Sequence, residues 1–535
     1  MGHNDRGRPP QPARESSGGG ARPRGRVAWL LRVGRLYGAE PAWVSAAAFS
    51  AAFPGGSHPE PVSQSRISRW ETGRIEVPGR VIRRYEELLG LPACTLTATV
   101  DLVTRYLSPG RAGPGRRRPD AEPGDRLESF VDQACSSAPM AAAAWEDGVA
   151  LVMAEPGLRL RRRDWDSICN RLLVETVAAD GDAWKPRFEA FSRLLQHPHA
   201  QPSAAAACAG WARCRDNQVF IETVSLLDAC RHPDAAVAIV GQLTNPTNDF
   251  AFAGALLACI RKVPEGHFSP PQLATVGDAA AQVLTDTTPG QAELRSHAAT
   301  VLASLPPGQA AAAVMAWRPA PSADGPGLAG SAAAGSSLSS LIAARSVSLL
   351  PREIARFTDH VLPVLVDEIL HAQVADTRMY SAFLIRSSPY AQPVASALGW
   401  GLSRLRPERS PQLAARLLEA LRILGGGTQR ALAERLTGPS LPFEVREAAF
   451  RALGHMGGVS APSFWPRVFA EHSQRARAGR GSDRLLGHAV YAIAMERDFP
   501  RLRRIAADPD LPGPVRAAAA WWLSLPGHML ASAER

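Results

Sequence analysis

The sequence predicts an all-α protein. Alanine, leucine and arginine recur at spacings of three and four, and runs of alternating β-branched residues are scarce. Helix-breaking positions with proline or glycine recur about every 15–25 residues, a spacing typical of the ends of ordinary helices. With 535 residues the chain is too long for one compact core, so several domains or an extended array of helices are expected.

Low-complexity stretches divide the chain. Residues 1–25 are polar and rich in glycine, proline and arginine, which predicts a disordered basic tail. Linkers are predicted at 108–124 ("SPGRAGPGRRRPDAEPG") and at 318–337 ("RPAPSADGPGLAGSAAAGSS"). The folded segments are therefore expected at 26–107, 125–317 and 338–535.

The excess of positive charge lies in the first fifth of the chain. Of 60 basic and 50 acidic residues, residues 1–118 hold 19 arginines and 9 carboxylates, so residues 119–535 hold 41 of each and are neutral. A basic module on a neutral body predicts a polyanion as the partner of the module alone. An unstructured arginine-rich tail accounts for part of this excess.

The composition also indicates where the protein works. No stretch approaches the roughly 18 consecutive apolar residues of a membrane span, and the N-terminus lacks the apolar core of a secretory signal. A soluble cytoplasmic protein with no membrane partner is expected. The seven cysteines form no CxxC pair, and their odd number favours buried free thiols over disulfides.

The stretch "VSQSRISRWETGRIEVP" (62–78) predicts a short helix with a polar outer face. Ser63 is placed to cap a helix over 64–71, about 12 Å long. Ile67 and Trp70 share one face of this helix and are expected to pack inward. A glycine that can end the helix and a proline that blocks its resumption follow, namely Gly73 and Pro78.

Four more helices are expected around this one, at 26–38, 41–53, 79–92 and 93–107. With "QSRISRWETG" as the third of five helices, followed by a proline and by the Leu-Gly-Leu of 89–91, residues 27–107 resemble the repressor-type (XRE-like) helix-turn-helix domain of the lambda repressor and Cro class. The stretch "AAFPGGSHPEPV" adds roughly ten residues between helices two and three. The loop around 54–61 is either a harmless excursion, a minor contact arm or a sign that the module has drifted from the family. Helix two also lacks the glutamine that the family uses on a phosphate.

The resemblance implies that double-stranded DNA is the partner, with the third helix in the major groove. Amide and guanidinium groups pair with adenine and guanine, and serine hydroxyls contact either bases or phosphates. The implied base contacts are Gln64, Ser65, Arg66, Ser68 and Arg69. The implied phosphate contacts are Arg32, Arg35 and Arg74. A solvated helix face is the alternative for Arg66 and Arg69, while Ile67, Trp70, Leu31 and Leu88 are assigned to packing.

The rest of the chain repeats a pattern. In "RLTGPSLPFEVREAAFRALGHMGG" (435–458) and "IAADPDLPGPVRAAAAWWLSLPG" (505–527), a helix end leads through a proline turn to Val-Arg and a small-residue helix. Residues 284–307 follow the same plan and 226–243 follow it weakly. This pattern resembles HEAT-type (HEAT/armadillo-like) repeats, which implies an α-solenoid in two segments. A non-repetitive helical domain is the alternative.

Other patterns carry no chemistry that the sequence supports. "GPGLAG" (325–330) satisfies G-x-G-x-x-G without a preceding strand, and "RRRDWD" (161–166) is typical of a solvated turn. His197, His199, Cys208 and Cys214 match no zinc spacing. We therefore expect no metal site, no cofactor, no catalytic residues and no enzymatic activity.

The leading hypothesis is a sequence-specific transcriptional regulator. Its N-terminal module would read an operator, while its helical repeats would bind a protein partner, sense a ligand or form a homodimer. One alternative is a helical-repeat scaffold with a vestigial DNA-binding module. Another is a HEAT-like DNA glycosylase, against which the neutral balance of 119–535 argues.

Overall fold

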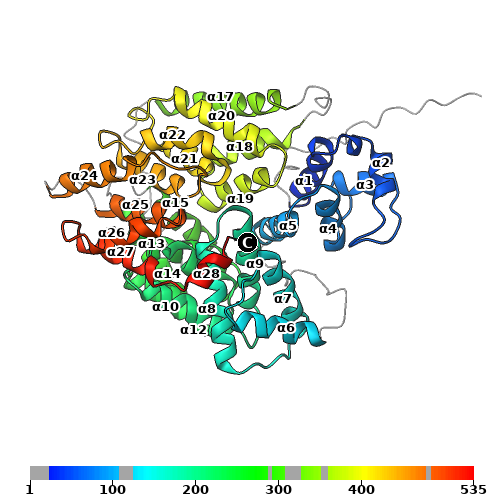
Figure 1. The fold of residues 1–535 in the computed structure, drawn as a ribbon, viewed down its shortest axis with the longest axis horizontal. Coiled ribbons are helices and arrows are strands. Elements are labelled where there is room, and N and C mark those ends of the chain that lie inside the picture. Colours follow the sequence, from blue (N-terminus) through cyan, green and yellow to red (C-terminus); the bar gives the residue numbers. More distant parts are fainter. Residues whose placement is uncertain are drawn as a thin grey trace, which may run out of the picture.

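The computed structural model describes residues 23–107, 124–286, 292–307, 327–350, 359–477 and 483–534. These residues form helices and loops, with no strand apart from an isolated bridge between Gly55 and His58 (Figure 1). The predicted all-α class is confirmed. Within the described ranges, no helix combines the length and apolarity that crossing a bilayer requires.

The described helices fall into three groups along the chain. The N-terminal module (23–107) contains α1 (Pro23–Tyr37), the 3₁₀ turn η2 (Pro41–Val44), α2 (Ala46–Ala52), α3 (Gln64–Glu71), α4 (Gly79–Leu88) and α5 (Thr95–Leu107). The first array (124–307) contains α6 (Gly124–Cys135), α7 (Ala142–Ala154), α8 (Arg162–Ala178), α9 (Gly181–Leu194), α10 (Gln201–Arg213), α11 (Phe220–Ser225), η3 (Leu226–Ala229), α12 (Pro233–Thr244), α13 (Asp249–Lys262), α14 (Pro270–Thr285) and α15 (Ala292–Ser304). The second array (327–534) contains α17 (Gly327–Ser348), α18 (Val361–His371), α19 (Ala375–Arg386), α20 (Ala391–Arg404), α21 (Pro411–Leu424), α22 (Gly427–Arg435), α23 (Phe443–Leu453), α24 (Phe464–Arg477), α25 (Asp483–Met495), α26 (Phe499–Ala507), α27 (Gly513–Ser524) and α28 (Gly527–Ser532).

Helices in both arrays pack in a regular order. In the second array α19, α21, α23, α25 and α27 each contact the next member of this row; in the first array α8, α10, α12 and α14 do the same. Val445 and Val515, the valines of the two clearest repeat copies, are both buried at the starts of α23 and α27. This order is the one that stacked helical pairs produce. The two-segment solenoid and the kinship with HEAT repeats remain predictions.

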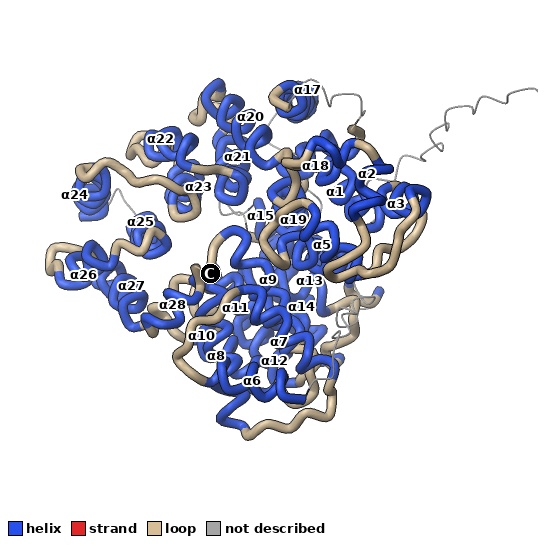
Figure 2. Tube along the Cα trace, turned by 45° about the vertical axis from the view of Figure 1, so that its right-hand side comes forward, coloured by secondary structure: helices blue, strands red, loops and turns tan. Residues whose placement is uncertain are grey.

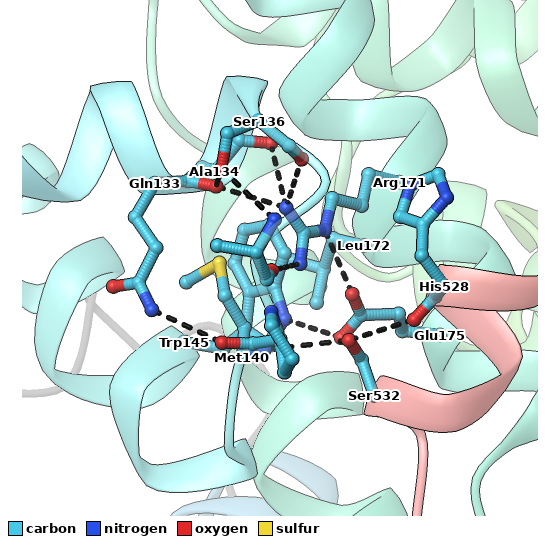
Figure 3. A network of polar contacts seen from close by, with 12 residues as sticks. Gln133, Ala134, Ser136, Met140, Trp145, Arg171, Leu172, Glu175, His528 and Ser532 are labelled. Carbon is cyan, nitrogen blue, oxygen red and sulfur yellow. Dashed lines mark hydrogen bonds and ion pairs between the residues drawn. The ribbon is translucent and has the colours of Figure 1, made fainter.

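A buried polar network ties the C-terminal helix to the first array (Figure 3). Glu175 on α8 accepts hydrogen bonds from Trp145 (2.7 Å), Arg171 (2.8 Å) and Arg187 (3.3 Å). Arg187 also donates to the carbonyl of Ser532 on α28, at 2.6 Å. The side chains of Arg171, Glu175 and Arg187 are at most 1 % exposed. The end of the chain is thus held against helices that lie more than 300 residues earlier.

The N-terminal module is docked on the arrays through α1 and α5. Arg26 on α1 is buried and pairs with Glu368 on α18, at 2.5 Å. The indole of Trp29 donates to Asp359 at 2.9 Å, and its ring stacks on Tyr390 at 6.2 Å. The module therefore shares a polar and aromatic interface with the second array, although the first array is the one that follows it in the chain.

Some predicted boundaries differ from the structure. The helix predicted at 41–53 is divided, because Ser45 adopts an extended conformation and caps α2 by accepting from the Ala48 amide. Residues 327–337, predicted as linker, form the first half of α17, since alanine stabilises a helix against the glycines and serines between them. The predicted tail over 1–22 and most of both linkers, 108–123 and 318–326, lie outside the described residues.

Candidate nucleic-acid interface

Local signals set the bounds of α3, the helix predicted over 64–71. The Ser63 hydroxyl accepts a hydrogen bond from the Arg66 amide at 3.3 Å and caps the N-terminus. Gly73 has a φ of +67°, a left-handed conformation that costs glycine little and ends the helix. Pro78 then occupies the N-cap position of α4, without a side-chain hydrogen bond. The predicted bounds of this helix are confirmed residue by residue.

The inner side of α3 is fixed by apolar packing. Ile67 and Trp70 are at most 1 % exposed, as predicted. The ring of Trp70 lies 5.8 Å from that of Phe53, which follows α2, so α2 packs behind α3. Burying large apolar side chains in this way holds a short helix that would be marginal alone.

A buried ion pair fixes the end of α3. Glu71 accepts two hydrogen bonds of 2.7 Å from the Arg35 guanidinium on α1 and one of 3.0 Å from the Tyr85 hydroxyl on α4. Burial lowers the pKa of Arg35, but the hydrogen bonds and charge of Glu71 outweigh burial and raise it overall. Burial raises the pKa of Tyr85, so its hydroxyl stays protonated and donates. Three helices are thereby joined at one carboxylate.

The outer side of α3 is open to solvent. We call it the α3 face; its side chains are all exposed and are those of Gln64, Ser65, Arg66, Ser68 and Arg69. In both Figure 1 and Figure 2, α3 lies at the outer edge of the molecule, with α1 between it and the arrays. The α3 face is therefore open to solvent at the outer edge of the molecule, on a helix whose other side is buried.

Unpaired positive charge gathers at the α3 face. Among the described residues, Arg66, Arg69 and Arg74 have no carboxylate within ion-pair distance, although the Arg66 guanidinium lies 5.5 Å above the Trp70 ring. Every carboxylate of the described module does have a hydrogen-bond or ion-pair partner. The carboxylates and their principal partners are Glu40 with Ala42, Glu60 with Arg80, Glu71 with Arg35, Glu76 with Arg24, Glu86 with Leu96, Glu87 with Arg84, and Asp101 with Arg193.

The predicted phosphate contacts divide into one exposed residue and two that the fold covers. Arg74, in the turn after α3, is exposed. Arg35 is buried, with its guanidinium engaged by Glu71 and the carbonyls of Trp43 and Val44, so its assignment to a phosphate is wrong. Arg32 is half-buried, and burial lowers its pKa. Arg32 lies on α1, the helix whose residues Arg26 and Trp29 dock on the second array. This position does not favour a phosphate contact.

The extra loop between α2 and α3 folds back on α4. Arg84 donates to the carbonyls of Ala52 (2.9 Å) and Phe53 (2.8 Å), and Glu87 accepts from the Ser57 amide at 3.1 Å. Gly56 has a φ of +50°, and a Cβ there would lie 2.0 Å from the Glu87 carboxylate. The loop is thus pinned to its own module, which fits an excursion better than a contact arm.

Sequence reasoning missed Glu71, which joins the end of α3 to α1 and α4 and so helps to support the α3 face. Its partner Arg35 lies 36 residues away, and no local signal links the two positions. Of the residues considered as metal ligands, His197 is buried against the Glu155 carbonyl and Cys208 lies in the core, and the described residues contain no group of three or more His, Cys, Asp or Glu side chains placed to hold a metal. Five of the seven cysteines are buried as expected, whereas Cys135 is exposed and Cys214 partly so.

Comparison with known proteins assigns the chain to no family. No protein-family model matches the chain, and no curated protein matches it.

Proposed function

We propose that the protein is a sequence-specific DNA-binding transcriptional regulator that reads its operator with the α3 face. The observation that carries this proposal is the exposure of Gln64, Ser65, Arg66, Ser68 and Arg69 on a helix whose other side is locked into the module. An eight-residue helix is about 12 Å long, comparable to the width of the major groove. Guanidinium and amide groups at its surface match the hydrogen-bonding edges of guanine and adenine.

The distribution of charge supports the same proposal. Arg66 and Arg69 on α3 and Arg74 in the turn after it have no carboxylate within ion-pair distance among the described residues, so they keep their attraction for phosphates. Arg74 would contact the backbone beside the groove, where it adds affinity without base preference. The two helical arrays would place this module and take part in dimerisation, ligand sensing or partner binding.

Two variants test which arginine contacts a base and which contacts a phosphate. Arg69→Ala is expected to cost about 1–3 kcal/mol on the preferred sequence and to relax base preference at one position. Arg74→Ala is expected to weaken binding to all duplexes alike. It should also reduce the slope of the logarithm of the binding constant against the logarithm of salt concentration by the contribution of about one phosphate contact. Gel shifts of the full chain on sequences selected from genomic fragments, repeated at several salt concentrations, measure both effects.

Arg409→Ala is the matched control, because Arg409 is exposed on a loop of the second array and should leave DNA binding unchanged. If neither Arg69→Ala nor Arg74→Ala changes binding relative to this control, the docking through α3 is wrong. A complete lack of salt-sensitive retention by the wild type would favour a protein-interaction scaffold instead.

A further inference from the structure

A cavity of about 60 Å³ lies between the two arrays. From the first array it is lined by the end of α8, the start of α9 and the residue just before α11. From the second array it is lined by α19, α21, α25 and the residue two positions after α23. Its polar and aromatic lining residues are Asp180, Trp184, Phe383, Arg422, His455 and Tyr491. Nothing in the proposed DNA contact uses this cavity.

Part of the cavity wall is apolar and suited to an organic group. The rings of Trp184 and Phe383 stack at 5.3 Å with 15° between their planes. Val177, Met379 and Ile423 complete this side. Since one water needs roughly 10–15 Å³ of such space, the cavity can hold a ligand of about five non-hydrogen atoms.

The polar side of the cavity has a guanidinium group without a carboxylate partner among the described residues. Asp180 accepts from the Gly181 amide at 2.6 Å and lies 2.7 Å from His455, whose other nitrogen is 2.9 Å from the Tyr491 hydroxyl. Asp180 is therefore already engaged. Arg422 also lines the cavity, and no carboxylate among the described residues lies within ion-pair distance of it.

The residues just behind the wall add to this excess of positive charge. Lys185 and Arg386 share the single carboxylate of Asp182, at 3.0 and 3.4 Å. Gly181, with a φ of +56°, allows this approach, because a Cβ there would lie 2.4 Å from the Arg386 guanidinium. A positively charged cavity with an aromatic wall favours an organic anion over an inorganic one.

We propose that this cavity binds a small organic monocarboxylate, with the carboxylate on Arg422 and the apolar tail against Trp184 and Phe383. Propionate has the matching size and charge. A charge-assisted bond to a guanidinium would orient the carboxylate, and the stacked rings would exclude water from the tail.

The same wall contacts the N-terminal module. Lys185, next to Trp184, donates to the Ser387 hydroxyl at 2.6 Å, and this hydroxyl lies 2.8 Å from that of Thr99 on α5. Occupancy of the cavity is therefore expected to change the DNA affinity of the module. This consequence rests on the proposed function, whereas ligand binding itself does not.

Calorimetric titration of the full chain with three probes of equal size tests the site: propionate, neutral propionamide and zwitterionic glycine. Saturable binding of propionate alone is expected, and Arg422→Gln should weaken it about tenfold or more. The control Arg409→Gln should bind as the wild type does. Thermal unfolding with and without propionate provides a second readout, because a ligand of the folded state raises the midpoint.

Three results would overturn the proposal: propionamide binding as tightly as propionate, unchanged binding by Arg422→Gln, or no saturable binding of propionate. Preferential binding of glycine would also overturn it and would assign a zwitterion, held by Arg422 and the 46 % exposed Asp180 side chain. A gel shift with propionate then separates the two proposals. Propionate binding without any DNA retention would support the ligand site and contradict the proposed function as a DNA-binding regulator.

Discussion

Glu175→Gln is expected to destabilise the protein by about 3–5 kcal/mol, because it leaves two buried guanidinium groups without their shared carboxylate. Arg171 and Arg187 both donate to Glu175, and all three side chains are almost completely buried. Glutamine keeps the volume of glutamate, so the loss reports charge and hydrogen bonding rather than a cavity. Chemical denaturation of the full chain, monitored by circular dichroism, measures the change.

Asp166→Asn is the matched control on the same helix. Asp166 pairs with Arg162 at 3.7 Å on the surface, where the two side chains are 42 and 72 % exposed. Exposed pairs of this kind contribute little, so the change should stay within about 0.5 kcal/mol. Equal effects of the two substitutions would show that the network of Figure 3 does not stabilise the contact between α28 and the first array.

Trp70→Ala is expected to cost about 3–5 kcal/mol in the N-terminal module and to abolish DNA binding. The indole is 1 % exposed and packs against Phe53, so its loss leaves a cavity beneath α3. The α3 face would then lose the support that orients it. Hydrogen exchange should show faster exchange across 23–107 and little change in the arrays.

Ser65→Ala serves as the stability control, since this exposed residue of the same helix should change stability by no more than about 0.5 kcal/mol. Full protection of the module amides in Trp70→Ala would contradict the packing assigned to this residue. Retained DNA binding by a variant whose module has lost its protection would contradict the role assigned to the α3 face.

The fold class and α3 could be predicted because their signals are local. Ser63, Gly73 and the Ile67–Trp70 pair act within one or two helical turns, so their consequences follow from chain geometry and hydrogen bonding alone. The same holds for the Val-Arg starts of α23 and α27. These are the parts of the structure that need no knowledge of distant neighbours.

The role of Arg35 could not be predicted because it depends on tertiary packing. Most of α1 is buried, since one side packs in the module and another docks on the second array. A sequence with one apolar stripe gives no sign of a second covered face. The contact between Arg187 and Ser532 spans 345 residues and is equally invisible to local reasoning.

Methylation protection with the intact protein tests the central claim most directly, because it reports on guanine N7 in the major groove and on adenine N3 in the minor groove. On a duplex selected from genomic fragments, the wild type is predicted to protect guanines in the operator, and Arg69→Ala is predicted to lose protection at a single guanine while keeping the others. Protection that is identical in wild type and Arg69→Ala, or that falls only in the minor groove, would contradict the reading of DNA by α3.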